Sequence, residues 1–151
     1  MTRVAAIDCG TNSIRLLVAD GHIDENGRPQ LADLTRQMRI VRLGQGVDAR
    51  GYLDPAAIER TVEATVEYQR MIEALGATST RFVATSATRD ASNSADFVRQ
   101  IKAIIGVEPE VVVGTEEASL SFNGAVSGLG ESVAAPMLVV DIGGGSTELV
   151  L

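Results

Sequence analysis

The sequence has 151 residues, enough for one domain with a substantial core, and its apolar runs stay well short of the roughly 20 residues that span a bilayer. A net charge of −7 argues against a nucleic-acid surface, which needs a basic patch. The same charge means that a polyanion would have to be bound by local amides, a few arginines and a divalent cation. The single cysteine, Cys9, cannot form an internal disulfide, which favours a cytoplasmic location.

The first half of the chain is predicted to form a hairpin, a third strand and a long helix. The hairpin strands are expected at residues 3–9 and 14–20, and a more exposed strand at 35–44. Asp54 is predicted to cap the helix, with Pro55 at its first position and Gly76 just past its end. Its expected apolar stripe consists of Ile58, Val62, Val66, Ile72 and Leu75.

The second half alternates strand and helix. A strand is predicted at 81–85, a helix at 95–105 and a buried strand at 110–113. Thr115 is predicted to cap a further helix, and residues 137–151 are predicted to form a second hairpin. The stripe of that helix is expected to be Ala118, Phe122, Ala125, Val126 and Leu129. Three strands followed by alternating helix and strand indicate an α/β layered fold.

The two hairpins repeat one sequence pattern. Residues 5–18, AAIDCGTNSIRLLV, align without gaps to residues 138–151, LVVDIGGGSTELVL. The identical pairs are Asp8 with Asp141, Gly10 with Gly143, Ser13 with Ser146, and Leu16 with Leu149. Most of these identities fall in the turns, where chemistry is expected.

Each turn has the composition of an anion-binding loop. In the first, Gly10 allows close approach to a ligand, and Thr11, Asn12 and Ser13 offer side-chain donors beside consecutive backbone N–H groups. Asp8 is placed to hold Mg²⁺ through water. The second turn offers Gly143, Gly144, Gly145 and Ser146 after Asp141. An ordinary Asx-type turn explains one copy equally well, but two copies favour phosphate binding.

Four motifs together carry a family resemblance. They are D-C-G-T-N-S at 8–13, T-S-A-T-R-D-A at 85–91, G-T-E-E-A at 114–118 and D-I-G-G-G-S-T-E-L at 141–149. The sequence resembles the exopolyphosphatase and guanosine pentaphosphate phosphohydrolase (Ppx/GppA) family of the actin-like ATPase superfamily. The resemblance implies an α/β, ribonuclease H-like lobe with a mixed central sheet flanked by helices, followed by the opening hairpin of a second lobe.

The resemblance also implies that the chain is divided between two lobes and that its last hairpin lacks its usual packing partners. Residues 1–126 are expected to form the first lobe, and residues 127–151 the start of the second. The sequence is therefore expected to be a fragment with low activity alone. An isolated hairpin is marginal in water, so residues 137–151 are expected to be mobile or to pack unusually, for example on another copy in a homodimer.

The resemblance assigns catalytic roles to Glu117 and Arg89. Glu117 would be the general base for the attacking water, and a carboxylate near phosphate and away from bulk water should have a raised pKa. Glu116 is the lesser candidate, and both glutamates also suit a first helical turn for reasons unrelated to catalysis. Arg89 would balance charge on the terminal phosphoryl group. Arg15, just beyond the first loop, either binds phosphate or faces solvent.

The implied reaction is hydrolysis, with water attacking the terminal phosphorus of inorganic polyphosphate or guanosine pentaphosphate. Asp8, Asp141 and Glu148 correspond to acidic residues around the metal, expected to be Mg²⁺. Nucleic acid and membranes are not expected as partners. Two alternatives remain: an ATP-dependent kinase or ATPase of the same superfamily, and a non-catalytic module that binds guanosine nucleotides.

Overall fold

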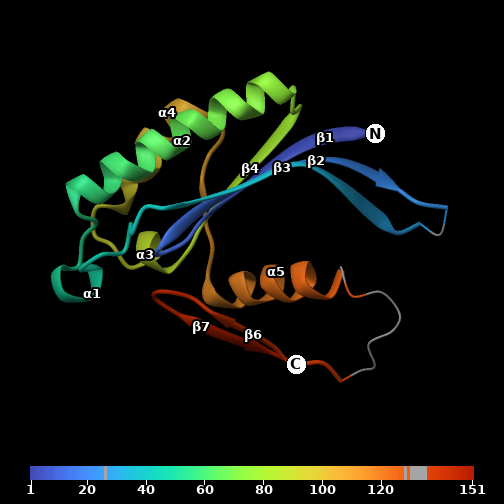
Figure 1. Cartoon of the computed structure of the whole chain (residues 1–151). Helices are drawn as coiled ribbons and strands as arrows, with labels where there is room; N and C mark the ends of the chain where they lie inside the picture. The colour runs from blue at the N-terminus through green and yellow to red at the C-terminus, as the bar shows by residue number, and fades with distance from the viewer. Residues whose placement is uncertain (26, 128, 130–135) are drawn as a thin grey trace.

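The computed structural model describes residues 1–25, 27–127, 129 and 136–151. Its main sheet has the strand order β3-β2-β1-β4-β5, and a separate two-stranded sheet is formed by β6 and β7 (Figure 1). Helices α2 and α4 cover one face of the main sheet, while α5 and the β6–β7 pair lie across the other. The expected mixed sheet flanked by helices is confirmed.

The main sheet combines antiparallel and parallel pairing. Strands β1 (Thr2–Cys9), β2 (Ser13–Ile23) and β3 (Pro29–Ile40) form an antiparallel meander, with a register shift between Val18 and Ala19. β4 (Ser79–Ala84) pairs parallel to β1, and the short β5 (Glu110–Val111) pairs parallel to β4. The parallel strands end at the same edge as the β1–β2 turn, which places the motifs that follow them side by side.

The remaining elements follow the predicted order. The helices are α1 (Val47–Arg50), α2 (Pro55–Leu75), α3 (Ser86–Arg89), α4 (Ser94–Ile105) and α5 (Gly114–Ser127), and the final hairpin consists of β6 (Val139–Ile142) and β7 (Thr147–Val150). The Asp54 side chain accepts from the Ala56 N–H at 2.9 Å, and Gly76 takes the left-handed conformation at the end of α2. Both predicted caps of α2 are therefore confirmed.

The core lies between the sheet and the pair α2 and α4. Side chains alternate along β1, so that Ala5, Ile7 and Cys9 are buried on this face. The predicted stripe of α2 is confirmed in part: Ile72 is buried, and Ile58, Val62 and Leu75 are half-buried and pack against the edge of the core. Small and hydroxylated residues contact the sheet, with Ala57, Thr61, Ala64, Thr65 and Tyr68 buried. The hydroxyls of Thr61 and Thr65 donate to carbonyls one turn back, which makes their burial tolerable.

Three sequence-based boundaries were wrong. The third strand ends at Ile40, because the following residues turn back to bond the β1–β2 turn. The predicted buried strand 110–113 has only Val112 buried, since β5 is a short edge strand. Thr115 does not cap α5, because the Val113 carbonyl already accepts from the N–H groups of Glu116 and Glu117.

The final hairpin packs on α5 rather than extending the main sheet. β6 and β7 pair with each other and contact α5. Their residues alternate between half-buried and exposed, and Val140, Ile142 and Leu149 present an exposed apolar face. The connection between α5 and β6 includes residues 130–135, which lie outside the described residues. In the described part of the chain, no helix is both long and apolar enough to cross a membrane.

Candidate active site

The first predicted phosphate loop is a tight β1–β2 turn held from outside by the segment after β3. The Gly10 N–H donates to the Ser13 carbonyl at 3.0 Å, which closes the turn. The Asn12 carbonyl accepts from the N–H groups of Val41 and Arg42, and the Gly44 N–H donates to the Thr11 carbonyl at 2.9 Å. The segment after β3 thus fixes the loop in place from a distant part of the sequence.

The second predicted phosphate loop, between β6 and β7, repeats the first. The Gly143 N–H donates to the Ser146 carbonyl at 2.9 Å, which matches the Gly10–Ser13 bond. The repeat seen in the sequence is therefore a repeat of backbone geometry. The hairpins differ in one cross-strand pair: Asp8 lies opposite Arg15, whereas Asp141 lies opposite Glu148. Two like charges opposite each other are unfavourable, so the second hairpin concentrates negative charge.

The glycines of the second loop serve close approach rather than an unusual backbone conformation. The glycines of the two loops do not have positive φ angles; among the described residues, the glycines that do are Gly27, Gly46, Gly51, Gly76 and Gly106. A Cβ at Gly144 would lie 2.6 Å from the Asn12 amide nitrogen. A Cβ at Gly145 would lie 2.7 Å from Thr11 Oγ1 and 2.8 Å from Ser86 Oγ. The second loop therefore sits directly against the first loop.

The short helix α3 completes this junction. The Ser86 hydroxyl, at its first position, lies 2.9 Å from Thr11 Oγ1. Thr85, immediately before it, is buried at the end of β4. The T-S-A-T-R-D-A motif and both glycine turns thus meet at one point, as expected if all three contact one phosphate group.

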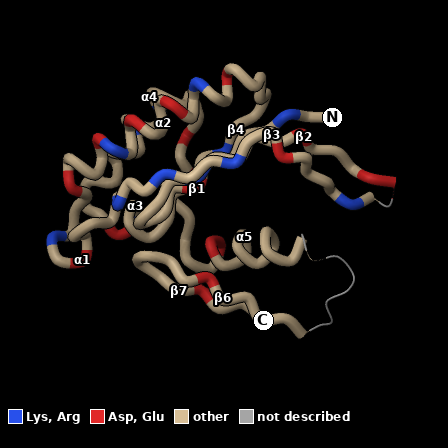
Figure 2. The backbone as a smooth tube through the Cα atoms, viewed as in Figure 1, with Lys and Arg blue, Asp and Glu red and all other residues tan. Residues whose placement is uncertain are grey.

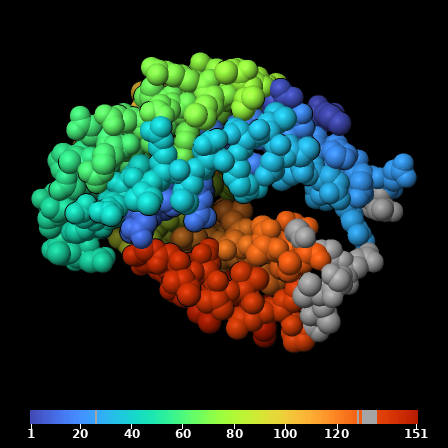
Figure 3. Space-filling view, in the orientation of Figure 1, coloured from blue at the N-terminus to red at the C-terminus, as the bar shows by residue number. Residues whose placement is uncertain are grey.

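A cleft of about 640 Å³ lies along the open face of the sheet, and Thr85, next to the junction, is part of its lining. The loop residues 10–13 and 143–146 do not line it, although Asp8 and Asp141, just before them, do. Figure 3 shows the hollow between the strands and α5. Its charged lining residues are Asp8, Arg15, Arg36, Arg81, Glu117 and Asp141. The apolar part of the lining includes Leu17, Met38, Val83 and Leu120. Acidic positions of α5 and of the β6–β7 pair lie next to one another beneath the sheet (Figure 2).

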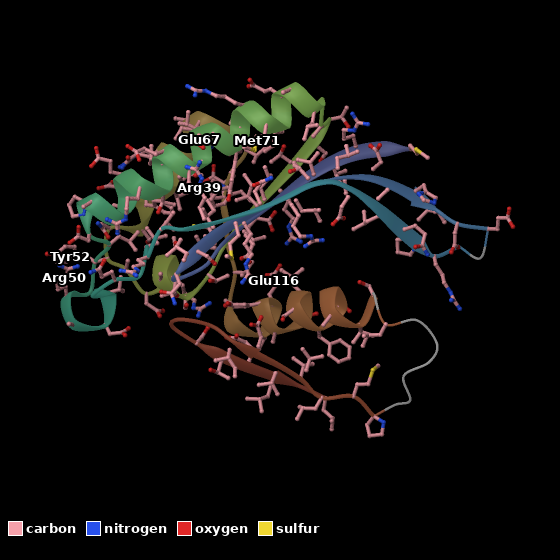
Figure 4. All side chains as sticks on the ribbon, viewed as in Figure 1. Arg39, Arg50, Tyr52, Glu67, Met71 and Glu116 are labelled. Carbon is pink, nitrogen blue, oxygen red and sulfur yellow. The ribbon has the colours of Figure 1, made fainter. Side chains whose placement is uncertain are left out.

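The structure separates the two adjacent glutamates of G-T-E-E-A. Glu117 lines the cleft, and its side chain is 16% exposed. Burial raises the pKa of Glu117, and the nearby Glu148 carboxylate raises it further, while Arg89 and Thr85 lower it as hydrogen-bond partners. Glu116 instead pairs with Arg81 at 3.3 Å and points from the start of α5 toward the sheet (Figure 4). The geometry therefore favours Glu117 over Glu116 as the base.

Arg89 lies behind Glu117 rather than among the residues that line the cleft. Its Nη1 donates to the Val112 carbonyl at 2.8 Å and to Glu117 Oε2 at 3.3 Å. Arg89 therefore ties the end of α3 to the start of α5 and favours the ionised form of the base. In this conformation its guanidinium is committed to protein partners, while Arg15 lies in the cleft beside Asp8.

Asp8 and Asp141 face each other across the cleft. Asp8 keeps solvent access there but is otherwise surrounded by protein, which raises its pKa; Arg15 lowers it and Asp141 raises it. Among the described residues, no three carboxylate, histidine or cysteine side chains are grouped closely enough to form a metal cage. Mg²⁺ needs only one or two carboxylates together with substrate phosphate and water, so Asp8 and Asp141 fit it. The negative charge of Glu148 acts on Glu117, whose pKa it raises.

The sequence did not single out several residues of the cleft. Thr85 and Ser86 lie within a recognised motif, so that proximity to Arg89 could have drawn attention to them. Ser121 lies four residues after Glu117, and this helical spacing predicts the same face of α5. Arg36 and Met38 reach the cleft only because β3 pairs beside β2, which no local pattern shows.

Comparison with known proteins agrees with this geometry. Residues 21–151 match the Ppx/GppA phosphatase family. Exopolyphosphatase 2 of Mycobacterium tuberculosis is 52% identical over 156 aligned residues, which cover all of this chain and 48% of that protein. A solved exopolyphosphatase-like protein is 48% identical with a TM-score of 0.90, covering 98% of this chain and 44% of its own.

A Ppx/GppA family member from Aquifex aeolicus is 32% identical with a TM-score of 0.80, over 98% of this chain and 46% of that one. The chain spans about half the length of each of these relatives. Strand order and neighbours agree on the ribonuclease H-like fold of the actin-like ATPase superfamily. The chain belongs to the Ppx/GppA phosphatase family.

Proposed function

We propose that this chain carries the catalytic base and both phosphate loops of a phosphohydrolase that releases the terminal phosphate of inorganic polyphosphate. The observation that carries the proposal is the half-buried Glu117, which lines the cleft with Thr85. The two loops, closed by the same backbone hydrogen bond, meet at the adjacent Ser86. The name of the Mycobacterium tuberculosis relative supports polyphosphate as the substrate. Guanosine pentaphosphate, losing its 5′ terminal phosphate, is the second substrate to test.

In the proposed reaction, Glu117 accepts a proton from water as the water attacks the terminal phosphorus. Its raised pKa suits proton transfer near neutral pH, and Arg89 and Thr85 hold the carboxylate in the cleft. The N–H groups and hydroxyls of the two loops, residues 10–13 and 143–146, would bind the phosphate oxygens. Arg15 would add positive charge beside Asp8.

Asp8 and Asp141 are the proposed Mg²⁺ ligands, with Glu148 beside them in the second hairpin. When bound, Mg²⁺ would neutralise charge on the phosphate oxygens. The two like-charged pairs, Asp8 with Asp141 and Asp141 with Glu148, are unfavourable without a cation. This charge arrangement supports a metal role over a purely structural one.

The proposal also includes a boundary and a setting. We propose that residues 1–126 form the first lobe and residues 127–151 begin a second, with the cleft between them. The contacts of β6 and β7 with α5 and of Gly145 with Thr11 support the second part of this proposal. We further propose that the reaction takes place in the cytoplasm.

The test compares Glu117→Gln with Glu116→Gln, which changes a neighbouring glutamate in the same way. The Glu117→Gln variant should lower phosphate release from long-chain polyphosphate with Mg²⁺ by about 100-fold or more, because the base is lost. Glu116→Gln should keep most of the activity, since Glu116 faces Arg81. Equal loss in both variants, or none in either, would refute the role of Glu117.

A further inference from the structure

Helix α5 presents a second polar side chain to the cleft, one turn after Glu117. Ser121 follows Glu117 by four residues, so the two lie on the same face of the helix, and both line the cleft with Leu120 between them. Described residues of α5 are at most half-buried, so Ser121 is not a core residue. Its position therefore calls for a reason other than packing.

The Ser121 hydroxyl has a well-defined partner in the second hairpin. Ser121 Oγ donates to Asp141 Oδ2 at 2.7 Å, the usual distance for a well-formed hydroxyl hydrogen bond. This bond connects the helix that carries the base with the strand that leads into the second phosphate loop. It thus joins the proposed base and the proposed metal ligand through a single helical turn.

The bond also acts where negative charge is concentrated. Asp141 lies opposite Glu148 on the same face of the hairpin and faces Asp8 across the cleft. A donated hydrogen bond to one oxygen of Asp141 limits rotation of the carboxylate. Because Asp141 lines the cleft, the bond to Oδ2 also limits the positions that its second oxygen, Oδ1, can take there.

We propose that Ser121 is a positioning residue that orients the Asp141 carboxylate for a divalent cation, an inference that rests on the proposed function. Ser121 does not touch the reacting atoms; it acts through Asp141. The hydroxyl fixes the carboxylate relative to Glu117, so that cation and base are held at a constant separation. Loss of the hydroxyl should weaken cation binding before it affects the fold.

The experiment measures binding of Mn²⁺, as a spectroscopic substitute for Mg²⁺, to the chain without substrate by electron paramagnetic resonance. Ser121→Ala should weaken Mn²⁺ binding by about tenfold, as is usual when a hydrogen-bond partner of a metal ligand is removed. Ser121→Thr, which keeps a hydroxyl, should restore most of the affinity. Ser119→Ala is the matched control, because Ser119 is exposed two residues earlier on α5 and should leave binding unchanged.

Three results would overturn the proposal. They are Mn²⁺ binding by Ser121→Ala as tight as by the parent chain, equal weakening by Ser121→Thr, and no Mn²⁺ binding by the parent chain. Thermal unfolding of each variant shows whether a loss of Mn²⁺ binding comes from misfolding. Mn²⁺ binding is measured without hydrolysis, so this experiment can refute the role of Ser121 without refuting the proposed function. The Glu117 and Glu116 variants test the proposed function itself.

Discussion

Glu116 and Glu117 are adjacent and chemically identical, yet their surroundings differ. Arg81 holds Glu116 in an exposed ion pair, whereas Glu117 is turned into the cleft with a raised pKa. Exposed ion pairs of this kind contribute little to stability, typically about 0–1 kcal/mol. The difference between the two residues is therefore one of chemistry rather than of folding energy.

Asp8 offers a stability test of the same cleft. Its pKa is raised in the folded state, so the folded chain holds this proton more tightly than the unfolded chain does. The contribution of Asp8 to the free energy of unfolding therefore falls as pH rises from about 4, the ordinary value for aspartate, through the raised pKa. At neutral pH the ionised carboxylate disfavours the folded state.

Asp8→Asn should accordingly raise the melting temperature at neutral pH without added metal. The difference should shrink as pH falls toward about 4 and disappear below it, where the parent carboxyl becomes protonated in both states. Thermal unfolding followed by circular dichroism at both pH values measures it. Asp48→Asn, on the exposed face of α1, is the control. A lower melting temperature for Asp8→Asn at neutral pH would contradict the prediction.

The two hairpins show how one element is used twice with different results. Both turns close with the same backbone hydrogen bond, but the first hairpin belongs to a five-stranded sheet and the second to a sheet of two strands. The second turn consists of glycines because it lies against Asn12, Thr11 and Ser86. Side chains at these positions would occupy the space of the first loop.

Gly145→Ala should therefore lower activity strongly, because its Cβ would lie within 2.8 Å of two hydroxyl oxygens and would push the second loop away. The main sheet and its core should remain intact, since Gly145 does not contribute to them. Gly124→Ala is the matched control: it lies in α5 with no atom within 4 Å of the added Cβ, and should stabilise the helix by about 0.5–1 kcal/mol. Phosphate release and thermal unfolding measure both effects, and unchanged activity in Gly145→Ala would disprove the close-approach explanation.

In the whole molecule, the two faces of the main sheet differ in packing. The face under α2 and α4 carries the core, with Phe82, Phe97, Ile101 and Leu16 almost fully buried. The other face carries the cleft, and the elements across it, α5 with β6 and β7, have no fully buried residue among those described. The proposed site thus lies on the face of the sheet that is packed less tightly.

Hydrogen exchange should follow this division. The amides of β1 and β4 should exchange slowest, because their opening requires loss of the core. The amides of β6 and β7 should exchange much faster, since they are held by one partner strand and by α5. Exchange measured by mass spectrometry in a dilute sample tests this ranking. Protection of 139–150 equal to that of β1 would contradict it and would indicate packing on another copy.

The sequence alone determined the order of the elements, the caps of α2, the duplicated turn and the four motifs. These features are local: a turn, a cap or a periodic stripe depends on residues a few positions apart. The predicted stripe of α2 fell at the edge of the buried face, because close packing on the sheet placed Ala and Thr at its centre and the larger apolar residues beside them.

The resemblance already favoured Glu117 over Glu116, and the tertiary structure places Glu117 in the cleft. Only the tertiary structure showed that Arg89 bonds Glu117, that Gly145 meets Thr11 and Ser86, and that Ser121 bonds Asp141. Each of these contacts joins residues that are at least 20 positions apart in the sequence. The ion pair that holds Glu116 away from the cleft also joins distant residues, since Arg81 lies 35 positions before it. Such contacts depend on how the strands order themselves and on which face each helix presents. Local sequence patterns specify the parts of the site, whereas long-range packing specifies how they meet.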